Sequence, residues 1–134
     1  WWYIGDAMST LKADTIQNTS GGAATLTKQE AAKAWINYAG SGSSFNDSFN
    51  ASSATDNGTG DYTYSFTSSM SNTNYAICAT AANTSAGQPV VSACPANDEQ
   101  TTSQFNVEQG YTTNTSAYSN FDSEDYVSIF GDLA

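Results

Sequence analysis

The densest carboxylates of this sequence form two clusters, Asp98-Glu99 and Asp122-Ser123-Glu124-Asp125. Glycoside hydrolysis uses two carboxyl groups, one that protonates the leaving oxygen and one that attacks the sugar or activates water. Neither cluster has a spacing that selects such a pair, and both lie in loop-like sequence. Solvated charge on loops is therefore the interpretation that we favour for both clusters.

A second oxygen-rich run, residues 56–61 (DNGTGD), has the composition of a calcium-binding loop. Calcium loops place ligands at the first, third and fifth positions and a bidentate Glu much later, and this run lacks that order. We interpret it as a turn that leads into a strand at Asp61, with Gly58 and Gly60 at positive φ angles. The sequence predicts no metal site and no cofactor.

Cys78 and Cys94 are the two cysteines of the chain. They fall on two neighbouring predicted strands, and a hairpin centred near Ala86 would place them roughly opposite each other, as a cross-strand disulfide requires. Two buried free thiols, which pack like small apolar side chains, explain the sequence equally well. Zinc is disfavoured because nothing completes a set of four ligands.

Aromatic residues divide into two groups by their surroundings. In residues 61–67 (DYTYSFT) the rings alternate with polar residues, which predicts a strand with one face in the core. Tyr111, Tyr118 and Phe121 lie instead among Thr, Asn and Ser in turn-rich sequence. Rings beside amide and hydroxyl groups suit stacking on a sugar, so these three are the candidate binding residues. Anchoring of long loops is the alternative role for them.

Composition excludes several classes of partner. The chain has 134 residues with 3 Lys+Arg against 13 Asp+Glu, a formal net charge of −10, and no His. So few basic side chains leave no electrostatic footprint for nucleic acid or for an anionic membrane surface. Without His there is no Ser-His-Asp or Cys-His arrangement to activate a nucleophile. No run approaches the roughly 20 apolar residues of a membrane span. We expect neither nucleic acid nor membrane as a partner, and no enzymatic activity.

The backbone pattern predicts three parts. Residues 1–26 form an extended arm, and residues 27–35 form one short helix that begins at the capping box Thr27-Lys28-Gln29-Glu30. Residues 36–134 alternate with period 2 in short runs separated by turn residues, which is typical of an antiparallel β-sandwich. The predicted strands of this part cover residues 45–50, 61–67, 75–79, 90–93, 104–107 and 126–130.

Three runs resemble the C-terminal module of phage tail fibres: residues 33–38 (KAWINY), 48–53 (SFNASS) and 55–63 (TDNGTGDYT). In that family a K-A-W-V-N-F segment precedes S-F-N-V-S-S-I-T-D-N-G-T-G-D-Y-T, and a T-K-Q-x-A-A segment stands just upstream, as at residues 27–32. Residues 11–25 and 125–132 are also similar to this family, especially to short fibre-like proteins of marine and cyanobacterial phages. The resemblance spans most of the chain, and the middle departs from it.

The resemblance implies a homotrimeric tail fibre or fibre-tip protein of the virion. Such a protein contacts other tail or virion proteins and works outside the cell, where it attaches to a glycan or protein of the host surface. The expected fold is mainly β, an antiparallel, jelly-roll-like β-sandwich behind the arm and helix. A capsid decoration or fibre-stabilising protein with no receptor role is the alternative, and a polysaccharide-degrading tip enzyme is a third, less favoured one.

Trimerisation also has a physical motive in the sequence. The arm and the short helix expose apolar residues that a single chain cannot bury, and three copies around an axis can bury them mutually. The candidate residues of this trimer interface are Leu11, Ile16, Leu26 and Trp35.

Overall fold

The computed structural model describes residues 19–20, 31–40, 44–82, 90–93, 100–112 and 117–134 of the chain. Within these residues the fold is mainly β and contains nine strands, all of them paired antiparallel in two sheets. None of the described residues forms a helix, so no helix in this part of the chain is long and apolar enough to cross a membrane.

The first sheet has the strand order β2-β1-β9-β5. Its interior strands are β1 and β9, which lie far apart in the chain and pair over the whole of β1. The strands of this sheet are β1 (Ala34–Tyr38), β2 (Phe45–Phe49), β5 (Ala76–Ala81) and β9 (Asp125–Phe130).

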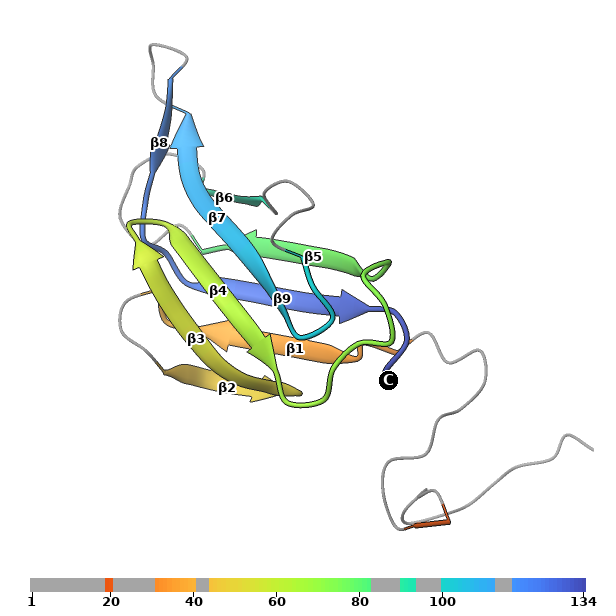
Figure 1. Cartoon of the computed structure of the whole chain (residues 1–134). Coiled ribbons are helices and arrows are strands. Elements are labelled where there is room, and N and C mark those ends of the chain that lie inside the picture. Colours follow the sequence, from red (N-terminus) through yellow and green to blue (C-terminus); the bar gives the residue numbers. More distant parts are fainter. Residues whose placement is uncertain (1–18, 21–30, 41–43, 83–89, 94–99, 113–116) are drawn as a thin grey trace, which may run out of the picture.

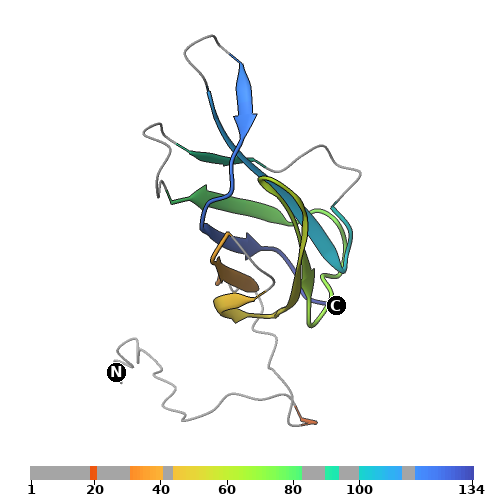
Figure 2. The same ribbon diagram turned by 90° about the vertical axis from the view of Figure 1, so that its left-hand side faces the viewer.

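The second sheet has the order β3-β4-β7-β6, and β8 pairs with the far end of β7. Its strands are β3 (Ala51–Gly58), β4 (Asp61–Phe66), β6 (Val91–Ala93), β7 (Gln104–Thr112) and β8 (Tyr118–Asn120). The two sheets lie against each other, while β8 and the end of β7 extend beyond them at one end (Figures 1 and 2).

One hydrophobic core lies between the two sheets. Alternation in β4 turns Tyr62, Tyr64 and Phe66 inward, as the pattern of residues 61–67 predicts. From the first sheet, Tyr38 meets this aromatic row edge-on, with ring centroids 5.0 Å from Tyr62 and 5.6 Å from Tyr64. Both sheets contribute to this core, whose buried members are Ala34, Ile36, Tyr38, Tyr62, Tyr64, Phe66, Met70, Tyr75, Phe105, Val107, Val127 and Ile129.

The interpretation of residues 56–61 is confirmed in part: residues 59–60 form a turn that leads into β4 at Asp61, whereas residues 56–58 belong to β3. Gly58 has φ 142° and Gly60 has φ 67°, both in the region that L side chains rarely adopt. A Cβ at Gly60 would also collide with the carbonyl of Gln109 on β7. Glycine at position 60 therefore lets the start of β4 and the end of β8 follow each other closely along the same edge of β7.

The helix predicted over residues 27–35 is wrong in its described part. Residues 31–33 are not helical, and Trp35 lies in β1. Ala34, Ile36 and Tyr38 are buried and alternate with more exposed residues, so sheet pairing with β2 and β9 overrides the helix propensity of the alanines. The capping box and nearly all of the predicted arm lie outside the described residues.

Each of the six predicted strands coincides with a strand of the structure, whereas β1, β3 and β8 are additional. The predicted hairpin around Ala86 is wrong. Its two strands, β5 and β6, lie at the ends of different sheets, where β5 pairs with β9 and β6 pairs with β7. A cross-strand pairing of Cys78 with Cys94 therefore has no basis in the sheet register.

Candidate functional site

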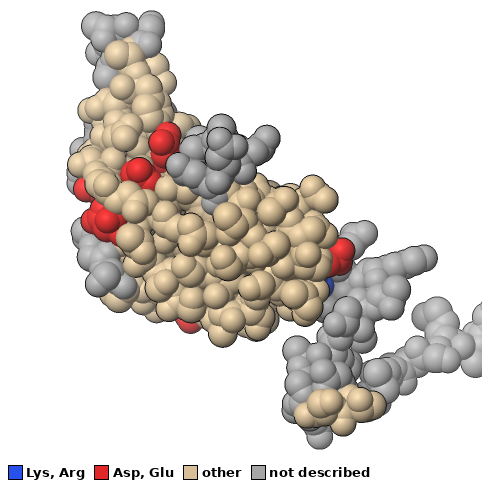
Figure 3. Space-filling model, in the orientation of Figure 1, with Lys and Arg blue, Asp and Glu red and all other residues tan. Residues whose placement is uncertain are grey.

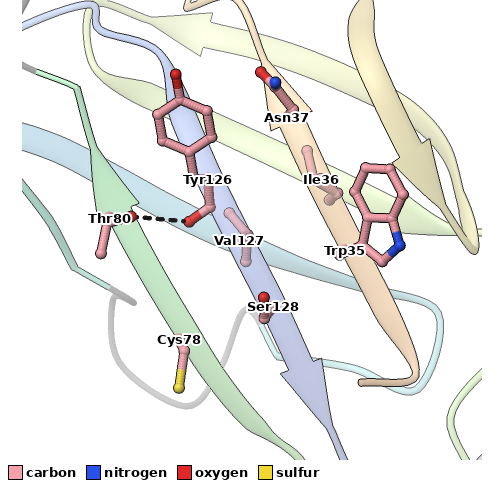
Figure 4. A pocket seen from close by; sticks show the side chains of 8 residues that line it. All are labelled: Trp35, Ile36, Asn37, Cys78, Thr80, Tyr126, Val127 and Ser128. Carbon is pink, nitrogen blue, oxygen red and sulfur yellow. Dashed lines mark hydrogen bonds between the residues drawn. The ribbon is translucent and has the colours of Figure 1, made fainter. Parts of the chain in front are cut away.

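The outer face of the first sheet carries a shallow groove of about 520 Å³. Strand register arranges its side chains in two rows: Trp35 beside Ser128 and Cys78, and Asn37 beside Tyr126 and Thr80. Figure 4 shows these side chains on three neighbouring strands. We call this set of six residues, Trp35, Asn37, Cys78, Thr80, Tyr126 and Ser128, the outer groove.

Aromatic rings of the outer groove are unusually exposed for their size. Trp35 is 38% exposed and Tyr126 is 42% exposed, because alternation in β1 and β9 directs them away from the core that holds Ile36 and Val127. No ring contact joins Trp35 to Tyr126. The faces of the two rings are therefore available to another molecule.

Hydrogen bonds orient the polar side chains around these rings. The Tyr126 hydroxyl donates to Oε2 of Glu124 at 2.7 Å, and this contact raises the pKa of the hydroxyl above its usual value. Thr80 Oγ1 donates to the Tyr126 carbonyl oxygen at 3.4 Å, and Asn37 Oδ1 accepts from Asn46 Nδ2 at 3.0 Å. None of the residues that line the groove is charged.

A second polar arrangement lies inside the molecule, around the fully buried carboxylate of Asp125. The Tyr64 hydroxyl donates to Asp125 Oδ2 at 2.7 Å, and Ser92 Oγ donates to Oδ1 at 2.8 Å. Burial raises the pKa of Asp125, while the hydrogen bonds from Tyr64 and Ser92 act in the opposite direction. Since Asp125 belongs to the first sheet and its donors to the second, this cluster joins the two sheets.

Burial and the negative charge of Asp125 also raise the pKa of the Tyr64 hydroxyl far above its usual value. The hydroxyl therefore stays protonated and acts as a permanent donor to the carboxyl group. Tyr64 and Asp125 are both fully buried, and the geometry of the pair fits a structural role.

The interpretation of the second acidic cluster as solvated loop charge is wrong. Asp122 Oδ1 accepts from the Gly60 backbone at 2.6 Å and from the Tyr62 hydroxyl at 2.8 Å, which fixes the β3–β4 turn. Glu124 accepts a hydrogen bond from the Tyr126 hydroxyl, and Asp125 is buried. The other cluster, Asp98-Glu99, lies outside the described residues.

The Asp61 carboxylate, near the β3–β4 turn, accepts hydrogen bonds from asparagine side chains. Asp61 Oδ1 accepts from Asn106 Nδ2 at 2.7 Å and from Asn57 Nδ2 at 3.1 Å. Within the described ranges no group of three or more Cys, Asp or Glu residues is placed to hold a metal ion. Acidic side chains gather at this end of the molecule, whereas most of the face seen in Figure 3 is uncharged.

The three candidate binding residues lie at the extension formed by β7 and β8, and the structure does not bring them to the outer groove. Tyr111 and Phe121 meet edge to face, with ring centroids 5.9 Å apart. Tyr118 is 48% exposed, and its ring lies so close to Gly110 that a Cβ there would collide with it. A binding role for these residues stays a prediction.

Among the candidate trimer residues, only Trp35 is described, and it stands in the outer groove. Leu11, Ile16 and Leu26 lie outside the described residues. Cys78 is an exposed free thiol in the same groove, and Cys94 lies outside the described residues.

The sequence reasoning missed Tyr126 as a surface residue, although a signal was present. In residues 125–130 (DYVSIF), burial of Val127 and Ile129 requires Tyr126, Ser128 and Phe130 to face the other way. Comparison of the chain with models of protein families, with curated proteins and with solved structures gave no match.

Proposed function

We propose that this chain is a jelly-roll-like β-sandwich module of a phage tail fibre or fibre-tip protein that attaches the virion to the host cell surface. The three fibre-like sequence runs coincide with β1, with the β2–β3 corner and with the β3–β4 hairpin, so they form one continuous part of the fold. Pairing of the first described strand with the last, β1 with β9, is consistent with the sandwich that the fibre resemblance implies.

The observation that carries this proposal is the outer face of the first sheet. Besides the outer groove it exposes Phe49, which is 52% exposed, and Phe130, which is 40% exposed. Exposed aromatic patches on a protein surface mark interaction sites. A rigid sheet that presents rings outward is suited to contact rather than to catalysis.

The proposal includes a homotrimer that works on the virion, outside the cell, alongside other tail proteins. Leu11, Ile16 and Leu26 are the proposed interface residues of the arm. Trp35, which the sequence assigns to the same interface, lies on the sheet face instead of on a helix.

Competition with adsorption tests the attachment function. The full chain, added in excess to host cells, should slow adsorption of the phage, and gold-labelled antibodies against it should mark the tail in electron micrographs. Unchanged adsorption together with label on the capsid would contradict the proposal. Light scattering of the full chain should give the mass of three copies.

A capsid decoration or fibre-stabilising protein is the second candidate function. The spread of exposed aromatics beyond the outer groove, to Phe49 and Phe130, favours it because large apolar patches also fit protein partners. Labelling of the virion separates the two functions, since a tail location with the sheet face outward is expected only of the attachment protein.

A further inference from the structure

We infer that the outer groove is a binding site for an uncharged saccharide, on the face formed by Trp35 and Tyr126. This inference rests on the proposed attachment function and names the ligand class and the residues that would bind it. It assigns the ligand to the first sheet rather than to the β7–β8 extension.

Charge is the first argument. The residues that line the outer groove are uncharged. Two acids flank it: Glu124 accepts the Tyr126 hydroxyl, and Asp47 on β2, which pairs with Asn37, accepts the Ser48 backbone amide at its Oδ1. The chain as a whole carries a formal charge of −10. An anionic ligand would be repelled at long range, and a cationic one finds no carboxylate in the groove, so a neutral ligand fits best.

The positions of the two exposed rings also fit a saccharide. Trp35 and Tyr126 occupy one diagonal of a square on β1 and β9, because the direct partners are Trp35 with Ser128 and Asn37 with Tyr126. Diagonal neighbours in an antiparallel pair are about 7–8 Å apart. The two rings make no contact with each other, and both are exposed. The C–H groups of a pyranose are weakly positive and rest favourably on the negative face of such rings.

Asn37 and Ser128 occupy the other diagonal of this square and carry polar groups. Asn37 keeps its Oδ1 occupied by Asn46, and within the described part of the chain neither its Nδ2 nor the Ser128 hydroxyl has a partner. These groups stand between the two rings, where the hydroxyls of a stacked sugar project. Donors and acceptors in fixed positions beside apolar rings are the usual composition of small-ligand sites.

The arrangement fits a saccharide better than a second copy of this chain. Protein interfaces have an apolar centre and a polar rim. Here Asn37 and Ser128 stand at the centre, while Phe49 and Phe130 lie toward the margins of the sheet face. The volume of about 520 Å³ is also within the range of roughly 300–1,000 Å³ that small-ligand sites occupy.

Nuclear magnetic resonance titration of the full chain tests this inference. The probes are maltotetraose, cellotetraose and N-acetylchitotetraose, with a sulfated heparin tetrasaccharide as the charged counterpart. At least one neutral probe should shift the Trp35 indole N–H signal and backbone signals of β1 and β9 with a dissociation constant below about 10 mM, a range typical of weak single-site contacts. The heparin probe should leave these signals unchanged.

Three variants locate the binding. Trp35→Ala should weaken it by about tenfold or more, which is the effect of losing one stacking surface. Tyr126→Phe should keep it within about threefold, because the hydroxyl is held by Glu124 and the ring is retained. Val91→Ala is the control, since its side chain is also exposed, at 52%, but lies on β6 of the other sheet, and it should leave binding unchanged.

Other outcomes overturn the inference. Absence of binding for all three neutral probes contradicts it, as does binding that Tyr118→Ala abolishes while Trp35→Ala does not. An oligomer that Trp35→Ala converts to monomers, with dispersed spectra that show an intact fold, assigns the groove to a second copy. The adsorption assay is separate: competition that persists without saccharide binding leaves attachment standing and removes the sugar site.

Discussion

Removal of one buried hydroxyl, by Tyr64→Phe, tests how the two sheets are held together. The Tyr64 hydroxyl donates to Asp125 Oδ2 at 2.7 Å across the core. The substitution keeps the ring and its contacts with Tyr38 and Phe105, whose centroids each lie 5.6 Å away. Any loss of stability therefore reports on the hydrogen bond rather than on packing.

The expected magnitude follows from the charge of the acceptor. A hydrogen bond to an ionised group contributes about 1.5–3 kcal/mol, and a buried charge that loses a donor is left partly unsatisfied. Ser92 Oγ remains on the other carboxylate oxygen, so we expect a loss of about 2–3 kcal/mol at pH 8. Once the carboxyl is protonated the bond joins neutral groups, and the loss falls to about 1 kcal/mol.

The pH dependence has a definite sign. Burial raises the pKa of Asp125 above its ordinary value of 3.8, so the folded chain binds this proton more tightly than the unfolded chain. Between the unfolded and the folded pKa, the contribution of Asp125 to stability therefore falls as pH rises. The Tyr64 hydrogen bond lowers the folded pKa, so Tyr64→Phe should raise it and extend that window upward.

Urea unfolding between pH 3 and 8 measures the stability, and carbon NMR of the side-chain carboxyl measures the titration of Asp125. Tyr62→Phe is the matched control, because it removes the same atom from a neighbouring ring whose hydroxyl binds Asp122 and the Gly40 carbonyl. It should leave the titration of Asp125 unchanged. An unaltered Asp125 titration in Tyr64→Phe, or equal losses at pH 3 and pH 8, would refute the reasoning.

Three further substitutions or reactions probe other parts of the fold. Gly60→Ala should lower the unfolding free energy by more than about 2 kcal/mol, because φ is 67° and the new Cβ meets the Gln109 carbonyl. Gly58→Ala, with open space around it, should lower the unfolding free energy by about 1 kcal/mol in the same urea assay. Asn50→Ala should lower the unfolding free energy by about 2–3 kcal/mol, because the side-chain amide forms hydrogen bonds with three backbone groups at 2.7–3.1 Å. If Asn50→Gly recovers that stability, the φ of 55° at this position is the larger factor. Native protein without reductant should react with a maleimide at Cys78, identified by peptide mass, and an unreactive Cys78 would contradict its exposed free state.

Local alternation predicts those strands whose two faces differ in polarity. β4 is the clearest case, since its aromatic residues all face the core. β3 has no such alternation: it is largely exposed and owes its extended form to pairing with β4, which local sequence does not reveal. Ala34 and the two alanines just before β1, Ala31 and Ala32, favour a helix in the local sequence. The strand forms because β1 pairs with β9, which lies some 90 positions later in the chain, and no local signal reports that pairing.

The candidate site was less predictable than the fold, for a related reason. The apolar residues of the run 126–130 predict a strand, but the surroundings of Tyr126 depend on which strands flank it. Register places Tyr126 beside Asn37 on one side and Thr80 on the other, and neither pairing has a signature in the sequence. Burial of Asp125 was missed because isolated carboxylates are almost always exposed, and only the three-dimensional fold brings Tyr64 and Ser92 to it.

The acidic segment before β9 links the interior cluster to the outer groove. Asp125 points into the core and joins the sheets, and the next residue, Tyr126, points outward into the groove. Glu124 then accepts the Tyr126 hydroxyl and fixes the tilt of its ring. Because adjacent residues of a strand face opposite sides, the bond between Tyr64 and Asp125 also holds the backbone that presents Tyr126. The Tyr126 ring is therefore positioned before any ligand arrives, so little conformational entropy of this side chain is lost on binding.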